Sequence, residues 1–192
     1  MYLFGNLINI IYKILVITPW KICSNNINRG DIIITEVQHY TWDTDEEWFE
    51  FYNTTGSTID LFGLEIMNEE YNPYFITEHL YIESEEYLIA GRRDNANHNG
   101  GLELDIDYGS FTLGQNSDFL SIFYDDSVNQ QEIARIEYTN SDNWGTNRGR
   151  SKIVTDVNLI PNNDTNYWCE SSTLYYGFWI FNTLYLDTIY IL

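Results

Sequence analysis

The stretch Glu47-Trp48-Phe49-Glu50-Phe51-Tyr52-Asn53 decides the fold of this chain. Successive side chains of a strand point to opposite faces, so Phe49 and Phe51 share one face. The residues between and beside them share the other face: Trp48, Glu50 and Tyr52. Aromatic residues at a period of two are typical of a half-buried strand. The polar residues 53–57 then predict a turn, and a second apolar run, 59–67, follows directly.

Similar short runs recur along the body of the chain, with turn residues about every ten positions. Strands are predicted at 31–38, 47–53, 59–67, 74–77, 80–82, 86–91, 111–113, 119–124 and 133–138. In the first of them, Ile32, Ile34 and Glu36 are predicted to share one face. Because no amphipathic helix interrupts these strands, the pattern predicts an all-β protein with a β-sandwich architecture. The predicted core residues are Ile34, Phe49, Phe51, Leu61, Leu64, Leu88, Phe111, Leu113, Ile122, Ile136 and Trp168.

Acidic residues dominate the charge of the chain. Its 192 residues include 29 Asp and Glu against 9 Lys and Arg, a net charge of −20, and the stretch 31–172 alone carries −22. A body this acidic repels phosphate backbones, so direct nucleic-acid binding is not expected. The charge attracts cations, although a solvated acidic surface is the preferred interpretation.

Both ends of the chain differ in composition from the body. Residues 1–29 are apolar and free of acids, which predicts a secretory signal peptide or a membrane-associating segment. Residues 30–172 form the predicted sandwich domain. Residues 173–192 are apolar and aromatic, and a closing strand, a membrane anchor and a frame error remain open for them. Contact with a membrane is expected only through these two ends, and Cys169 is expected either to be buried unpaired or to bond Cys23.

Six pieces of sequence, in order, resemble the lamin-tail domain family, and its bacterial branch most closely. They are 30–37 with 47–53 and 59–64, then 87–92, 99–101 with 108–113, 116–118, 136–138 with 149–151, and 163–169. The resemblance implies an immunoglobulin-like antiparallel β-sandwich. It also implies a non-catalytic module of secreted or cell-surface proteins, sometimes found beside hydrolases or nucleases. The chain departs from the family after Trp168, where the usual closing turn is missing.

Two loops suggest a metal site. The acidic run 43–47 does not fit an EF-hand, because Trp48 occupies the position of the required glycine. A looser calcium site would combine Asp43 and Asp45 with Asp105 and Asp107. An exposed acidic loop without metal is the preferred alternative. The three histidines lack zinc-binding spacing, and no other cofactor is predicted.

The carboxylates available for acid–base chemistry are Glu36, Glu47 and Glu50. Glu36 and Glu50 are expected to be cross-strand neighbours that flank a sheet, with Arg135 or Arg150 as their expected partner, so no catalytic residue is predicted. An aromatic platform for a sugar ring would use Trp42, Trp48 and Tyr52, with core packing as the alternative. The sequence therefore predicts a non-enzymatic binding or structural module with a protein or carbohydrate ligand. The alternatives are a calcium-stabilised adhesive domain and an accessory fragment of a larger secreted hydrolase or nuclease.

Overall fold

A computed structural model describes residues 27–109, 111–125, 130–139, 147–158 and 165–172 of the chain. The described elements are strands of two to ten residues and two single-turn 3-10 helices. In chain order they are β1 (Ile32–Gln38), η1 (Thr44–Glu46), β2 (Trp48–Asn53), β3 (Ile59–Asp60), β4 (Leu64–Asn68), β5 (Tyr74–Phe75), β6 (Tyr81–Ile82), β7 (Tyr87–Gly91), β8 (Ile106–Asp107), β9 (Ser117–Asp125), β10 (Gln130–Thr139), β11 (Lys152–Val154), η2 (Thr165–Tyr167) and β12 (Trp168–Glu170).

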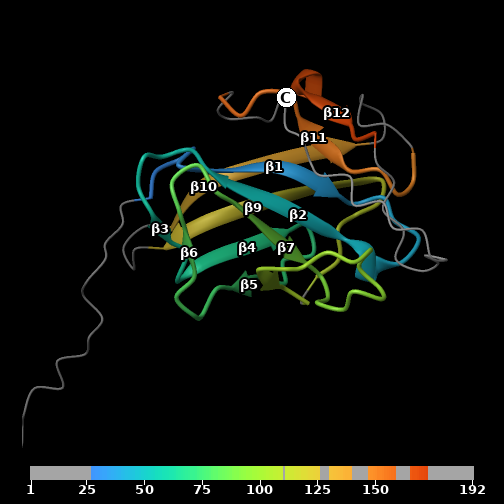
Figure 1. Cartoon of the computed structure of the whole chain (residues 1–192), viewed down its shortest axis with the longest axis horizontal. Coiled ribbons are helices and arrows are strands. Elements are labelled where there is room, and N and C mark those ends of the chain that lie inside the picture. The colour runs from blue at the N-terminus through green and yellow to red at the C-terminus, as the bar shows by residue number, and fades with distance from the viewer. Residues whose placement is uncertain (1–26, 110, 126–129, 140–146, 159–164, 173–192) are drawn as a thin grey trace, which may run out of the picture.

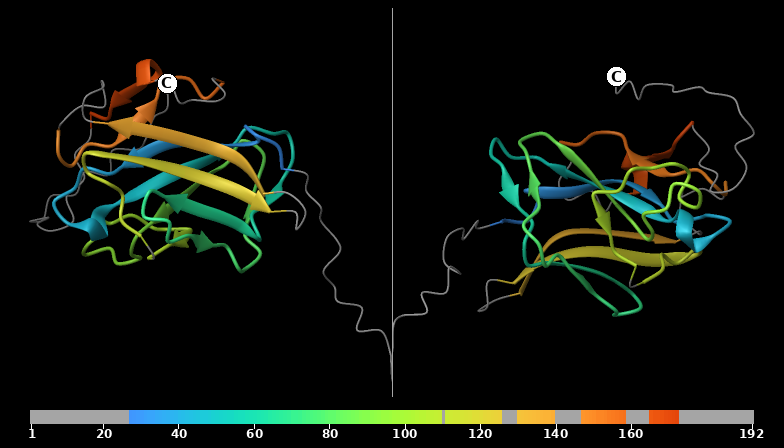
Figure 2. Two further views of the ribbon diagram at one scale, coloured as in Figure 1. Left: turned by 180° about the vertical axis from the view of Figure 1, so that it is seen from behind. Right: turned by 60° about the horizontal axis from the view of Figure 1, so that its bottom comes forward.

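These strands form two main sheets that pack face to face, so the predicted all-β sandwich is confirmed (Figure 1). A six-stranded sheet has the order β12-β11-β1-β2-β7-β8, and a four-stranded sheet has the order β10-β9-β4-β5. The strands β3 and β6 make a small separate pair. Neighbouring strands run antiparallel except β7 and β8, which are parallel. The long strands β9 and β10 form one outer wall of the molecule (Figure 2, left).

The core between the sheets is centred on the aromatic residues of β2. Phe49 and Phe51 are 0% and 2% exposed, and their ring centroids lie 5.0 Å apart. The Tyr108 ring stacks on Phe49 at 5.4 Å and on Phe111 at 4.5 Å. All of the predicted core residues lie in this buried cluster, and none is more than 7% exposed. Alternation along β2 therefore places its aromatic side chains as the sequence predicts.

The predicted face of β1 is wrong at its C-terminal half. Ile34 pairs with Phe51, but Glu36 pairs with Glu50 and Val37 with Phe49, so one extra residue, Thr35, lies in a β-bulge. A bulge reverses the alternation beyond it. Ile32, Ile34 and Val37 therefore enter the core, whereas Glu36 lies on the opposite face of the sheet.

Several predicted strand boundaries also change. The run 59–67 splits into β3 and β4, because the chain turns at Gly63, whose φ is +84°, and Leu64 N–H donates to the Leu61 carbonyl. Phe111 and Leu113 are buried, but residues 111–113 form no strand, and the Leu113 N–H donates to the Glu47 side chain. The three-residue strands β11 and β12 were not predicted, since so few residues carry no clear periodic signal.

Most of the two predicted end segments lie outside the described residues. Residues 1–26 and 173–192, and with them Cys23, are not among the described residues. Cys169 lies exposed on β12, so the alternative of unpaired burial is wrong, and the alternative of a bond to Cys23 involves a residue outside the described ranges. Within the described ranges, no helix has the length and apolar character needed to cross a membrane.

Candidate functional site

The predicted calcium ligands do not come together as one group. Asp43 caps η1, and its Oδ1 accepts the Asp45 backbone N–H at 3.1 Å. Ligand atoms of Asp43, Asp45 and His98 lie within 4.8 Å of one another, and Asp45 also pairs with Arg93 at 3.0 Å. This set offers two carboxylates and an imidazole, whereas calcium takes six to eight oxygen ligands.

The other two predicted ligands support the backbone instead. Asp105 Oδ2 accepts the Ile89 N–H at 2.8 Å, and Asp107 Oδ2 accepts the Asp94 N–H at 3.2 Å. Among the described residues, neither belongs to the group formed around Asp43. These bonds hold the loop between β7 and β8 against the sheet.

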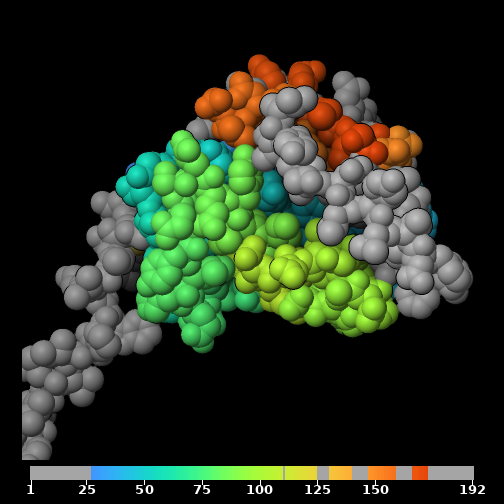
Figure 3. Space-filling view, viewed as in Figure 1, coloured from blue at the N-terminus to red at the C-terminus, as the bar shows by residue number. Residues whose placement is uncertain are grey.

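The predicted aromatic platform fails at Trp48. This side chain is 3% exposed, whereas Trp42 is 49% exposed and Tyr52 is half-buried against Tyr87. Trp48 pairs with Gly91 across the strands, and the Leu104 side chain lies directly over Gly91 on that same face. The segment between β7 and β8 forms part of the molecular surface (yellow-green in Figure 3). Its burial removes Trp48 from any ligand-binding platform.

Exposed aromatic rings instead gather beside β3 and β6. The His79 ring lies 4.8 Å from Phe62 and 6.2 Å from Tyr81, measured between centroids, and Tyr81 is 54% exposed. His79 Nδ1 contacts Oδ2 of the buried Asp60 at 2.6 Å, which fixes the ring orientation. No sequence pattern predicts this cluster, because its members come from two loops and two very short strands.

The cross-strand pair Glu36–Glu50 is confirmed by the register, but its predicted arginine partners are wrong. Glu36 accepts a hydrogen bond from Ser151 Oγ, and Glu50 Oε1 accepts one from Thr35 Oγ1 at 2.6 Å. The pKa of Glu36 is raised to about 7, mainly by burial. The hydrogen bond from Ser151 lowers this pKa, and the neighbouring carboxylate of Glu50 raises it. Burial also raises the pKa of Glu50, opposed by the bond from Thr35.

Glu47 lies inside the sandwich with only 1% of its surface exposed. Its Oε2 accepts the Leu113 N–H at 2.8 Å, and its backbone carbonyl accepts the Arg92 N–H at 3.0 Å. Burial raises the pKa of this carboxyl to about 8, opposed by the Leu113 bond and by Arg92. The nearby His39 is also buried, which lowers its pKa to about 4. These groups hold loops at one end of the sandwich.

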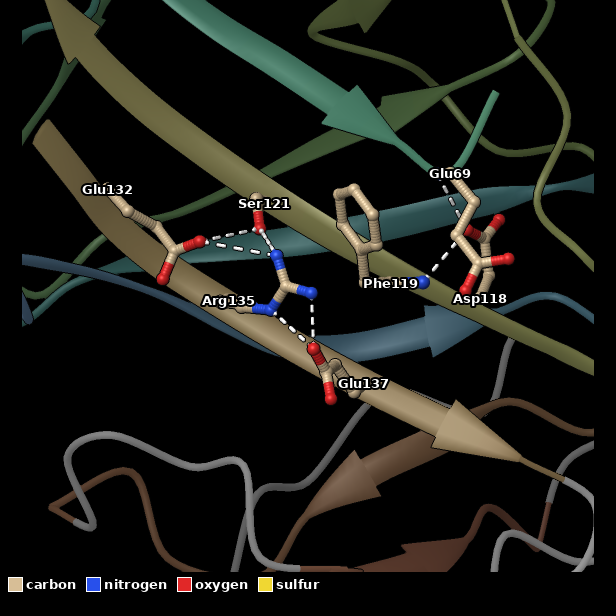
Figure 4. Close-up of polar contacts among 7 residues, drawn as sticks. All are labelled: Glu69, Asp118, Phe119, Ser121, Glu132, Arg135 and Glu137. Atoms are coloured by element: carbon tan, nitrogen blue, oxygen red, sulfur yellow. Dashed lines mark hydrogen bonds and ion pairs between the residues drawn. The ribbon is translucent and has the colours of Figure 1, made fainter. Parts of the chain in front are cut away.

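A groove lies on the outer face of the four-stranded sheet, where β9 and β10 meet the end of β4. Its volume is about 220 Å³. The Arg135 guanidinium lies 4.0 Å above the Phe119 ring centroid and bonds Glu137, Glu132 and Ser121 (Figure 4). The residues that line the groove are Glu69, Asp118, Phe119, Arg135, Glu137, Tyr138 and Thr139.

Asp118 is the structural support of this groove. Its Oδ2 accepts from Asn68 Nδ2 and the Gly114 N–H, and its Oδ1 accepts from the Glu69 and Phe119 backbones, all at 2.8–3.0 Å. The side chain is 4% exposed. Sequence reasoning found Asp118 only as a turn residue. Alternation does place Arg135 and Glu137 on one face of β10. Glu69 comes beside them only because β4 pairs with β9, which the sequence does not reveal.

Comparison with protein-family models and with curated proteins found no match to this chain.

Proposed function

We propose that this protein is a non-catalytic, secreted or cell-surface binding and structural module of the lamin-tail type, with an immunoglobulin-like sandwich. The ordered sequence pieces quoted above support the family, and the all-β sandwich is the architecture that the family implies.

The hydrogen bonds made by the three candidate carboxylates are the main support for a non-catalytic role. Glu47 bonds the Leu113 backbone inside the core. Glu36 and Glu50 each bond a hydroxyl on one face of a sheet, and neither borders the groove between β9 and β10. A general acid or base must reach the reacting group of a substrate. These three side chains serve the fold instead.

A hydrolysis screen tests this proposal. The full chain is assayed against glycoside, ester, peptide and phosphodiester substrates, beside the variants Glu36→Gln and Glu50→Gln. We expect no turnover above that of a buffer control. Turnover that disappears in either variant would overturn the proposal.

The predicted secretion or surface display of the protein is tested separately. We expect a bacterium expressing the full chain to release or display the protein with residues near 1–29 removed, because this segment resembles a signal peptide. Mass spectrometry of the mature N-terminus measures this directly. Intact protein retained in the cytoplasm would contradict secretion.

A further inference from the structure

The groove beside Arg135 already binds one cation, which the chain itself supplies. The guanidinium stacks on Phe119, its Nε donates to Glu137 at 2.8 Å, and its Nη1 contacts Glu132 at 3.3 Å. An aromatic face with carboxylates at its edge is a general arrangement for organic cations. The surface therefore has the chemistry needed to hold an ammonium or a guanidinium group.

The groove remains acidic after Arg135 is counted. Three carboxylates (Glu69, Asp118 and Glu137) and one guanidinium line it, which leaves a net charge of −2. Asp118 is saturated by donors of the chain, but Glu69 is exposed. Within the described ranges, the Glu69 carboxylate makes no hydrogen bond or ion pair, so it is available to a cation.

A second aromatic ring extends the apolar surface. Tyr71 is 71% exposed, and its ring meets Phe119 edge-on at 6.1 Å between centroids. Tyr71 also has a positive φ of 51°, which is uncommon for a residue other than glycine. Phe119 itself is only 8% exposed beneath Arg135, so the methylene groups of a lysine or arginine side chain can lie along Tyr71 while the charged end reaches Glu69.

Charge complementarity favours a basic side chain of a polypeptide as the source of the cation, because the groove carries a net charge of −2 and the exposed Tyr71 ring contacts one of its lining residues, Phe119. We propose that this groove binds a lysine or arginine side chain of a partner polypeptide. The proposal rests on the role of the protein as a binding module and names the chemistry of its partner.

The test is an NMR titration of the full chain at pH 7 with a blocked Gly-Gly-Lys-Gly-Gly peptide. The matched peptide carries norleucine, which has the same apolar length without the charge. We expect saturable shifts of the Phe119 and Tyr71 ring signals with the lysine peptide, in the millimolar range, and at least tenfold weaker binding of the norleucine peptide. Absence of saturable shifts with the lysine peptide would overturn the proposal.

Two variants separate the groove from general attraction to an acidic surface. Glu69→Gln removes the available carboxylate and is expected to weaken lysine-peptide binding about tenfold. Glu103→Gln removes an exposed carboxylate from the loop before β8 and is expected to change binding less than twofold. Equal weakening by both variants would mean non-specific attraction and would overturn the proposal. This readout is independent of the hydrolysis screen, so failure of the groove leaves the non-catalytic role standing.

Discussion

At the scale of single residues, Glu36 makes the stability of the sandwich depend on pH. Its pKa is raised from an ordinary 4.5 to about 7, chiefly by burial, so the folded state holds the proton more tightly than the unfolded state. This contribution to stability is fully present below about pH 4.5 and is lost as the pH rises toward 7. His39 acts in the opposite direction, because its lowered pKa costs stability as the pH falls from 6.5 toward 4.

The variant Glu36→Gln isolates the first effect. Between pH 4.5 and 7.5, we expect the free energy of unfolding of the native protein to fall relative to that of the variant by up to about 3 kcal/mol. Urea unfolding at several pH values measures the difference, and Glu103→Gln serves as the exposed control. Parallel pH curves for the native protein and Glu36→Gln would contradict this prediction.

Asn53, the last residue of β2, joins two loops through one buried side chain. Its Nδ2 donates to the carbonyls of Ser57, Ile82 and Glu83 at 2.8–3.1 Å, and its Oδ1 accepts the Thr55 N–H at 2.9 Å. Asn53→Ala leaves these groups without their partner, so we expect a loss of roughly 2–4 kcal/mol in unfolding free energy. Chemical denaturation measures it. The exposed Asn97→Ala is the control, and a similar loss there would show that Asn53 has no special role.

At the scale of elements, the turn before β9 depends on a close approach of two backbone segments. A Cβ added to Gly114 would lie 2.2 Å from the Ser117 carbonyl oxygen, whereas Gly56 has no atom within 4 Å of the same position. Backbone must therefore move to accept any side chain at 114.

Paired glycine substitutions test this turn. We expect Gly114→Ala to cost roughly 1–3 kcal/mol and Gly56→Ala to change stability by less than about 0.5 kcal/mol. Thermal or urea unfolding of both variants gives the comparison. Equal stabilities of the two variants would show that the turn relaxes freely around the added methyl group.

The β-bulge at Thr35 changes which residues of β1 face the core. Simple alternation places Glu36 with Ile34 on the core side, which would bury an acid among apolar side chains. The bulge moves Glu36 to the other face, beside Glu50, and brings Val37 into the core. No local sequence signal marks it, because an extra residue is defined only by the register of the neighbouring strand.

At the scale of the whole molecule, the structure weakens the calcium hypothesis. Of the four predicted carboxylates, Asp105 and Asp107 bond backbone amides, and Asp45 pairs with Arg93. We expect calcium at 1 mM to change the melting temperature by no more than about 1 °C relative to equimolar magnesium, since a ligand that binds weakly stabilises little. Scanning calorimetry measures this. A calcium-specific rise of several degrees would instead support the adhesive-domain alternative.

The amino-acid sequence alone predicts the alternation of the strands, the central position of Phe49 and Phe51 in the core, and the acidic surface. These features depend on residue order and composition alone, because alternation within one strand is a local property. The burial of Trp48 and the meeting of Glu69 and Phe119 at one groove were set by tertiary packing. Those facts depend on which distant segments pack together. The sequence of one strand does not specify the register of its neighbours or the loops that cover it.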